Sequence, residues 1–183
     1  MTVTDVMLRV VDALERANIP HMLVGSFSSN LHGIPRATED VDFVIELNAP
    51  LTAEFGKLLG EDFKPVLQMS FETNTGTQRQ EFYVKGTEFK AELFRLSDDP
   101  FDQQRFQRRQ LYEAVGRKLF FPTPEDVIVM KLRWARDKDK ADVHSVMSVK
   151  RGKLDWNYIE NWCRKHGTLA LMQKIRQSIP EIE

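Results

Sequence analysis

Two aspartates separated by a single residue are the side chains in this sequence best suited to chemistry. Asp40 and Asp42 alternate with apolar residues in the run Asp-Val-Asp-Phe, a pattern typical of a half-buried strand. Side chains alternate faces along a strand, so both carboxylates point to the same side and repel each other. A divalent cation with oxygen ligands offsets that repulsion, which predicts a site for Mg²⁺ or Mn²⁺. The alternative is a solvated strand face whose polar positions are aspartates.

A Gly25-Ser26 pair precedes the aspartates at the end of a short apolar run. We expect a strand over 21–24 and a short helix over 27–32. The start of a helix offers backbone N–H groups, and here also a hydroxyl, that can hold a phosphate. Gly-Ser alone is a common turn. In this order, however, the apolar strand, Gly-Ser, short helix and acidic strand together favour metal-assisted phosphoryl chemistry on a nucleotide.

The spacing of apolar residues predicts the elements that position these side chains. A first helix is expected after Thr2 or Thr4, and a further helix over 51–59. Strands are expected over 65–71, 81–84 and 89–94, with a hairpin over 111–121 around Gly116-Arg117, while 101–110 has no clear pattern. From Thr123 onward the pattern is helical, with helices over about 124–135, 139–149, 156–165 and 168–177.

These elements predict an α/β fold: a mixed β-sheet flanked by helices, with a helical C-terminal extension. We expect an α/β core over residues 1–122 and a helical region over 123–183 packed on that core. The length of 183 residues suffices for a sizeable core without disulfides.

Composition narrows the class of protein. Hydrophobic residues make up 42% and charged residues 29% of the chain, as in ordinary globular proteins. The net charge of −1 gives no global basic field for gripping long nucleic acid. Cys163 is the single cysteine, and the four histidines lack the spacing of zinc ligands. With no signal-peptide pattern at the start and no apolar run long enough to cross a bilayer, we expect a cytoplasmic protein with no zinc and no membrane segment.

Three segments carry a resemblance to a known family: Val24-Gly25-Ser26, Asp40-Val41-Asp42-Phe43 and Ala91-Glu92-Leu93. Together they resemble the DNA polymerase β-type nucleotidyltransferase superfamily in its small bacterial form. The resemblance implies that Asp40 and Asp42 bind metal and that Glu92 joins them as a metal ligand and as the base for the incoming hydroxyl. It also implies that Gly25 and Ser26 hold the nucleotide. Glutamate stands where aspartate is more usual, and a surface acid on an edge strand is the alternative for Glu92.

The tail is similar to AbiEii-like nucleotidyltransferases, a branch that includes toxins of bacterial abortive-infection and toxin–antitoxin systems. The similarity lies in residues 124–132 and 136–143. It implies that Lys131 contacts the triphosphate, with Asp139 or Asp142 nearby. From the residues alone, Lys131 either reaches solvent from an apolar helix or faces a polar cleft, and Asp139 is explained by helix capping.

The loop before the acidic strand holds two secondary candidates. Arg36 and Thr38 stand where such enzymes often carry Arg and Ser or Thr, and Arg36 could steer phosphate. A solvent-exposed loop arginine is the alternative.

The resemblance implies an Mg²⁺-dependent enzyme that transfers a nucleoside monophosphate from a nucleoside triphosphate to a hydroxyl of tRNA, a protein or a small molecule. An antitoxin would be its partner if the protein is a toxin. The alternative is a catalytically degenerate nucleotidyltransferase-like module that binds a nucleotide or a partner protein.

Overall fold

The computed structural model describes residues 1–49, 51–68 and 70–180, and within it the chain divides into two compact units. The first unit comprises residues 1–27 and 37–121, and the second comprises 28–36 and 122–183. Helix α2 (Gly25–His32) begins in the first unit and ends in the second. No helix among the described residues is long and apolar enough to cross a membrane.

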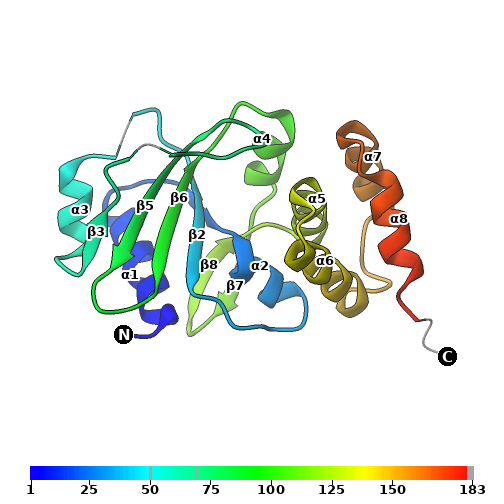
Figure 1. Cartoon of the computed structure of the whole chain (residues 1–183), viewed down its shortest axis with the longest axis horizontal. Coiled ribbons are helices and arrows are strands. Elements are labelled where there is room, and N and C mark those ends of the chain that lie inside the picture. The colour runs from blue at the N-terminus through cyan, green and yellow to red at the C-terminus, as the bar shows by residue number, and fades with distance from the viewer. Residues whose placement is uncertain (50, 69, 181–183) are drawn as a thin grey trace. The chain divides into compact units, whose positions relative to one another are not determined.

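A mixed sheet forms the centre of the first unit (Figure 1). Its strands are β1 (His21–Leu23), β2 (Asp40–Ile45), β3 (Phe63–Pro65), β4 (Ser70–Phe71), β5 (Gln78–Val84) and β6 (Lys90–Arg95). The order is β1-β2-β6-β5-β3, with β4 also paired to β5. Strands β2 and β6 run parallel, and the other neighbours run antiparallel. The strand expected over 65–71 is found only at its two ends, in the last residue of β3 and in β4; residues 66–68 are not in a strand, and residue 69 lies outside the described residues.

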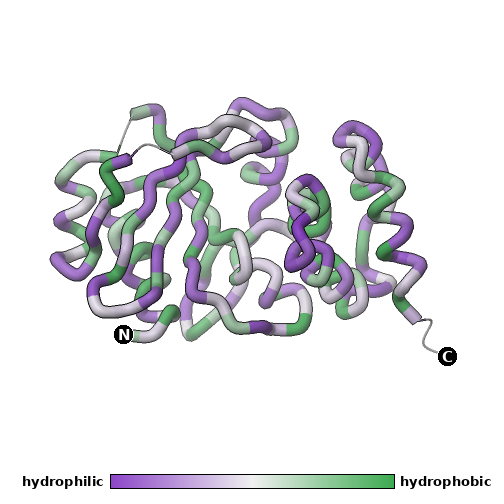
Figure 2. The backbone as a smooth tube through the Cα atoms, viewed as in Figure 1, coloured by the Kyte–Doolittle hydropathy of each residue, from purple (hydrophilic) through white to green (hydrophobic). Residues whose placement is uncertain are grey.

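Helix α1 (Val3–Arg16) packs on β2 and β6 and lies behind the sheet in Figure 1. Thr2 caps it, with Asp5 completing a capping box, as one of the two expected caps. Helix α3 (Ala53–Leu59) packs beside it. On β2, Val41 and Phe43 are fully buried while Asp40 and Asp42 are half-buried, so the alternation expected from the sequence is confirmed. Hydrophobic stretches accordingly run through the central strands (Figure 2).

Helix α4 (Pro100–Gln107) lies in the segment that gave no clear sequence pattern. Asp99 caps it and Pro100 is its first residue, but most of its residues are polar. It is held by a second apolar cluster, in which Phe106 packs with four residues of the sheet region. These are Met22, Val24, Val44 and Phe94. Tertiary packing, rather than helical periodicity, therefore makes this segment a helix.

Strands β7 (Gln110–Ala114) and β8 (Arg117–Phe121) form the expected hairpin. Its turn residues are Val115 and Gly116, with φ of 48° and 75°. Two residues with positive φ match the twist of a tight hairpin, which places the turn one residue earlier than expected.

Four helices make up most of the described part of the second unit. They are α5 (Pro124–Trp134), α6 (Asp137–Val149), α7 (Trp156–His166) and α8 (Leu169–Gln177). Thr123 caps α5 and Asp155 caps α7, as their sequence positions predict. Ala135 ends α5 in a left-handed conformation, and α6 begins two residues before its expected start. The α/β class with a mixed sheet and a helical C-terminal region is confirmed.

Candidate functional site

Strand register aligns three acidic residues of the first unit in one row. Asp42 of β2 pairs with Glu92 of β6, and Glu92 pairs with Glu81 of β5. Residues paired across a sheet share a face, so the three carboxylates lie side by side. Asp40 pairs with Lys90 in the next row. Glu92 is therefore on an interior strand, where it is 7% exposed, and not on a sheet edge.

Two cations offset the repulsion within this row. Lys90 Nζ lies 2.9 Å from Glu92 Oε1 and 3.7 Å from Asp40 Oδ1. Arg79 Nη2 lies 2.7 Å from Glu81 Oε1, and its Nη1 lies 3.4 Å from Glu92 Oε1. Burial by itself would lower the pKa of Lys90, but the hydrogen bond to Glu92 and the nearby carboxylates raise it above its ordinary value. Lys90 is therefore a permanent positive charge of this site at neutral pH.

The start of α2 lies directly against Asp42. Gly25 has a φ of +61°, and a Cβ atom at this residue would stand 1.9 Å from Asp42 Oδ2. Only glycine combines this backbone conformation with so close an approach. The Val24 N–H also donates to the Asp42 carbonyl over 2.8 Å. Gly25 and Asp42, separated in the sequence by helix α2 and the loop after it, thus meet in space. Ser26 follows in the first turn of α2, where backbone dipoles favour negative charge.

The side chains at this end of the sheet carry oxygen atoms, the type of donor atom that binds divalent metal ions such as Mg²⁺. Asp40 and Asp42 are hard oxygen donors on one face of β2, as Mg²⁺ prefers. Glu92 is engaged by Lys90 and Arg79, and no three His, Cys, Asp or Glu side chains within 1–49, 51–68 and 70–180 form a group that could hold a metal ion. The two aspartates are therefore the residues that would hold a metal ion. Thr38 Oγ1 donates to the Asp40 carbonyl and accepts from the Asp40 N–H, which orders the start of β2.

A buried ionic cluster joins α5 and α6 in the second unit. Lys131 Nζ lies 3.1 Å from Asp139 Oδ1 and 2.8 Å from Asp142 Oδ2. Arg36 binds Asp142 with Nε and Nη2, at 2.8 and 3.0 Å, and Arg136 Nε lies 2.6 Å from Asp139 Oδ2. The side chains of Lys131, Asp139 and Asp142 are at most 6% exposed. Lys131 therefore neither reaches solvent nor stands alone.

The cations of this cluster lower the pKa values of its two aspartates. Burial alone would raise the pKa values of Asp139 and Asp142. Hydrogen bonds from Arg136 and Lys131 to Asp139, and from Arg36 and Lys131 to Asp142, lower both pKa values below the ordinary range. Both carboxylates are thus charged at neutral pH. The structure brings together four residues that the sequence had singled out separately: Arg36, Lys131, Asp139 and Asp142.

Sequence reasoning missed the cations beside the acidic row. Lys90 stands two residues before Glu92, and Arg79 two residues before Glu81, so each pair shares one strand face. That alternation was visible in the sequence. The contact between the two pairs was not visible, because only the strand register places β5 next to β6 with Glu81 opposite Glu92.

Comparison of the sequence with models of known protein families finds one match. A family model described as "nucleotidyltransferase of unknown function (DUF6036)" matches residues 1–179. No curated protein matches the sequence.

Solved structures resemble the fold at low sequence identity. An antigenic nucleotidyltransferase-like protein from Paracoccidioides brasiliensis is 20% identical with a TM-score of 0.53, covering 93% of each chain. A nucleotidyltransferase-type protein from H. pylori is 16% identical with a TM-score of 0.52, covering 95% of this chain and 80% of the other. The lincosamide antibiotic adenylyltransferase LnuA with lincomycin bound is 10% identical with a TM-score of 0.50, covering 79% and 96%. These likenesses show a nucleotidyltransferase-like fold.

Proposed function

The chain belongs to the family of nucleotidyltransferases of unknown function (DUF6036), and from this premise we propose that it transfers a nucleoside monophosphate from a nucleoside triphosphate to an acceptor hydroxyl. The reaction would be Mg²⁺- or Mn²⁺-dependent. The acceptor oxygen forms a bond to the α-phosphorus, the bond from the α-phosphorus to the bridging oxygen breaks, and pyrophosphate leaves.

One observation carries this proposal: the contact between the Gly25 turn and the Asp42 carboxylate. A side chain at residue 25 would collide with Asp42 Oδ2, so the fold places a helix start against an aspartate with no room for a Cβ. On this proposal, the N–H groups at the helix start would bind phosphate beside a carboxylate that would bind the metal ion. A turn with only a structural role would not require a carboxylate at this position.

Each residue of the site has a role that its chemistry suits. Asp40 and Asp42 would hold the metal ion, which when bound neutralises phosphate charge and orients the triphosphate. Ser26 and the first N–H groups of α2 would bind phosphate oxygens. Glu92 would accept the proton of the acceptor hydroxyl, and Lys90 beside it would stabilise the carboxylate until the acceptor is bound. Catalysis on this scheme comes from positioning and charge neutralisation.

Lys131 is the candidate nucleotide contact of the second unit. Its ammonium group is held by Asp139 and Asp142, and Arg36 and Arg136 bring the cluster to three cations and two carboxylates. This excess of positive charge supports a role for Arg36 or Lys131 in attracting the triphosphate, with Asp139 and Asp142 as positioning residues. Thr38 would act by ordering the first residue of β2.

Label transfer tests the proposal. The chain is incubated with each labelled nucleoside triphosphate, Mg²⁺ or Mn²⁺ and cell extract, beside an Asp42→Asn variant. We expect label on one class of acceptor with the unaltered chain and at least a hundredfold less with the variant, since charge neutralisation at the phosphate carries much of such a reaction. Transfer that survives the substitution contradicts the metal assignment.

A nucleotide-binding module without turnover is the second candidate, and a specific observation favours it. Glu92 is bound by Lys90 and Arg79, so the third carboxylate is already neutralised. On this alternative the chain would bind a nucleoside triphosphate with Mg²⁺ but transfer no label to RNA, protein or small molecules.

The AbiEii-like branch and a toxin role are finer proposals that rest on the resemblance of residues 124–143. If they hold, induced expression arrests bacterial growth, Asp42→Asn relieves the arrest, and a protein antitoxin is the partner. Unimpaired growth on expression of a chain that transfers label in vitro would set the toxin role aside and leave the transferase.

A further inference from the structure

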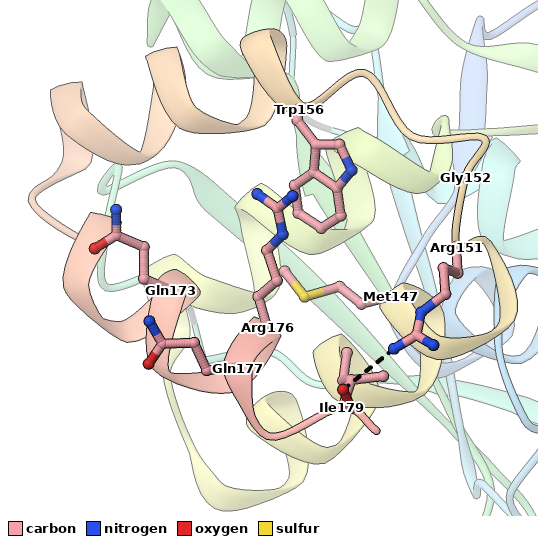
Figure 3. A pocket seen from close by; sticks show the side chains of 8 residues that line it. All are labelled: Met147, Arg151, Gly152, Trp156, Gln173, Arg176, Gln177 and Ile179. Carbon is pink, nitrogen blue, oxygen red and sulfur yellow. Dashed lines mark hydrogen bonds between the residues drawn. The ribbon is translucent and has the colours of Figure 1, made fainter. Parts of the chain in front are cut away.

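A hollow of ≈ 860 Å³ opens among the helices of the second unit, and no residue of the ionic cluster of α5 and α6 lines it (Figure 3). Met147 of α6 and Trp156 at the start of α7 lie in its wall. Arg176 and two glutamines come from α8, and Arg151 comes from the turn between α6 and α7. The hollow therefore presents one indole, two guanidinium groups and two amides.

The guanidinium group of Arg176 is stacked on the indole of Trp156. Its Cζ lies 3.8 Å from the ring centroid, and Figure 3 shows the two groups face to face. Arg176 Nη1 also lies 3.7 Å from Glu160 Oε1, a loose contact that leaves most donors of this guanidinium available. A guanidinium held flat by an aromatic ring offers its outer face for stacking and its edge for two parallel hydrogen bonds to phosphate.

Arg151 is positioned from the other side. Its Nη2 donates to the Ile179 carbonyl over 3.2 Å, the dashed line in Figure 3, which leaves the remaining donors of the fork for a ligand. Gln173 and Gln177 are four residues apart on α8 and so share a face, where each amide offers both a donor and an acceptor. Amides of this kind suit base edges and sugar hydroxyls.

Further basic residues are close in sequence to the two arginines that line the hollow. Lys150 and Lys153 lie in the same turn as Arg151, and Lys174 lies on α8 two residues before Arg176. Basic side chains combined with a stacking surface are what proteins use to bind the backbone and bases of a single strand.

We propose that this hollow binds a nucleotide unit of a single-stranded nucleic acid, with its phosphate on Arg151 and Arg176 and its base stacked on the outer face of the Arg176 guanidinium. None of its residues is Asp40 or Asp42, and binding there needs neither metal nor nucleoside triphosphate. It would supply the means by which this chain holds a nucleic acid acceptor.

Fluorescence anisotropy with a short labelled oligouridylate tests the proposal, using the full chain in EDTA so that no transfer occurs. The double variant Arg151→Gln, Arg176→Gln should bind about tenfold more weakly or worse, because two phosphate contacts and one stacking surface are lost. Lys138→Gln is the matched control: it removes one exposed charge from the same unit at the far end of α6 and should change affinity by less than about twofold.

Three results would overturn the proposal: no binding by the unaltered chain, equal affinity in the double variant, or binding of free uridine monophosphate as tight as that of the oligomer. Arg176→Lys keeps the charge but loses the planar stack and should still weaken binding, which covers a failure of the double variant to fold. An oligothymidylate of the same length shows whether the strand is RNA or DNA. Asp42→Asn should bind the oligomer normally, so this result stands apart from the test of the transfer chemistry.

Discussion

The lack of a Cβ atom at Gly25 determines how closely α2 can approach the acidic end of the sheet. Because Gly25 has no Cβ, the carboxylate of Asp42 can lie against the first turn of α2. The cations Lys90 and Arg79 then keep the row of carboxylates together when no metal is present. These contacts are specific enough to be tested one side chain at a time.

Gly25→Ala should destabilise the chain and abolish nucleotide-dependent function. The positive φ alone costs about 1–2 kcal/mol for a residue with a Cβ, and displacing Asp42 adds to that cost. Gly86→Ala is the control, because Gly86 has a φ of +74° with nothing within 4 Å of the added Cβ. Urea unfolding should show the larger loss of stability for Gly25→Ala. Equal losses in the two variants would mean that Asp42 can move away freely.

Lys90→Gln should increase the affinity of the site for Mn²⁺. Lys90 Nζ lies 3.7 Å from Asp40 Oδ1, so removing its charge relieves its repulsion of a cation bound at Asp40. Two unit charges about 4 Å apart interact by about 1 kcal/mol even at the dielectric constant of water, which corresponds to about fivefold tighter binding. Isothermal titration at pH 7 measures the effect, and Lys85→Gln, at an exposed lysine, should leave the affinity unchanged. Unchanged or weaker Mn²⁺ binding by Lys90→Gln would place the metal away from Asp40 and Glu92.

At the scale of elements, the pairing of α5 with α6 depends on buried charges as well as on apolar packing. Lys131 points from an otherwise apolar helix to two carboxylates of its neighbour, and Ser29 of α2 also donates to Asp142, over 3.2 Å. Loss of Lys131 would leave Asp139 with Arg136 and Asp142 with Arg36 as charged partners, and both buried carboxylates would lose a hydrogen bond.

Lys131→Met should lower the free energy of unfolding by about 1.5–3 kcal/mol, since Asp139 and Asp142 lose their shared cation and keep Arg136 and Arg36 as charged partners. Lys140→Met removes an exposed ion pair with Asp137 and should cost less than about 1 kcal/mol. Chemical denaturation of both variants provides the comparison. A cost for Lys131→Met as small as that for Lys140→Met would show that water already solvates the cluster.

Acid should weaken the second unit through the same cluster. The pKa values of Asp139 and Asp142 are lower in the folded chain than their ordinary value of 3.8, so below that value the unfolded chain binds more protons. The stabilisation is fully present above about pH 5 and is lost as the pH falls from about 4 toward the folded pKa values. Thermal unfolding across this range should show a shallower pH dependence in Asp142→Asn. Parallel curves for the variant and the unaltered chain would contradict the assignment.

At the scale of the whole molecule, the division into units does not follow the order of the sequence. Residues 28–36 belong with the C-terminal helices. His32 Nε2 hydrogen-bonds the Pro122 carbonyl at 2.9 Å, the Ile34 N–H donates to Ser145 Oγ over 2.6 Å, and Arg36 binds Asp142. A short N-terminal segment is thus an integral part of the second unit.

A chain ended after Phe121 should therefore be cleaved rapidly by trypsin after Arg36, because it lacks the residues that hold the segment 28–36. In the full chain the same bond should be cut at least tenfold more slowly, since proteolysis follows local opening and this arginine is in a bidentate ion pair. Cleavage after Arg95, in the interior strand β6, serves as the reference within each sample. Equal rates after Arg36 in the two chains would show that the segment is held without α6.

Local patterns were sufficient for most of the elements. The caps at Thr2, Thr123 and Asp155, the alternation of Asp40 and Asp42 with buried residues, and the Gly116 hairpin each follow from interactions among neighbours in the chain. Helix α4 was missed because its apolar contacts come from the sheet rather than from its own periodicity.

By itself, the sequence determined the α/β class, the acidic strand and the family resemblance, because these depend on side-chain alternation, capping and motif spacing over short stretches. Only the tertiary structure decided which ion-pair and hydrogen-bond partners the charged residues have. Strand register brought Glu92 between Asp42 and Glu81 and gave the two glutamates Lys90 and Arg79 as partners. Helix packing joined Lys131 to Asp139 and Asp142, and Asp142 is also bound by Arg36. Coulombic and hydrogen-bonding partners are set by distance in space, which residue spacing along the chain does not specify.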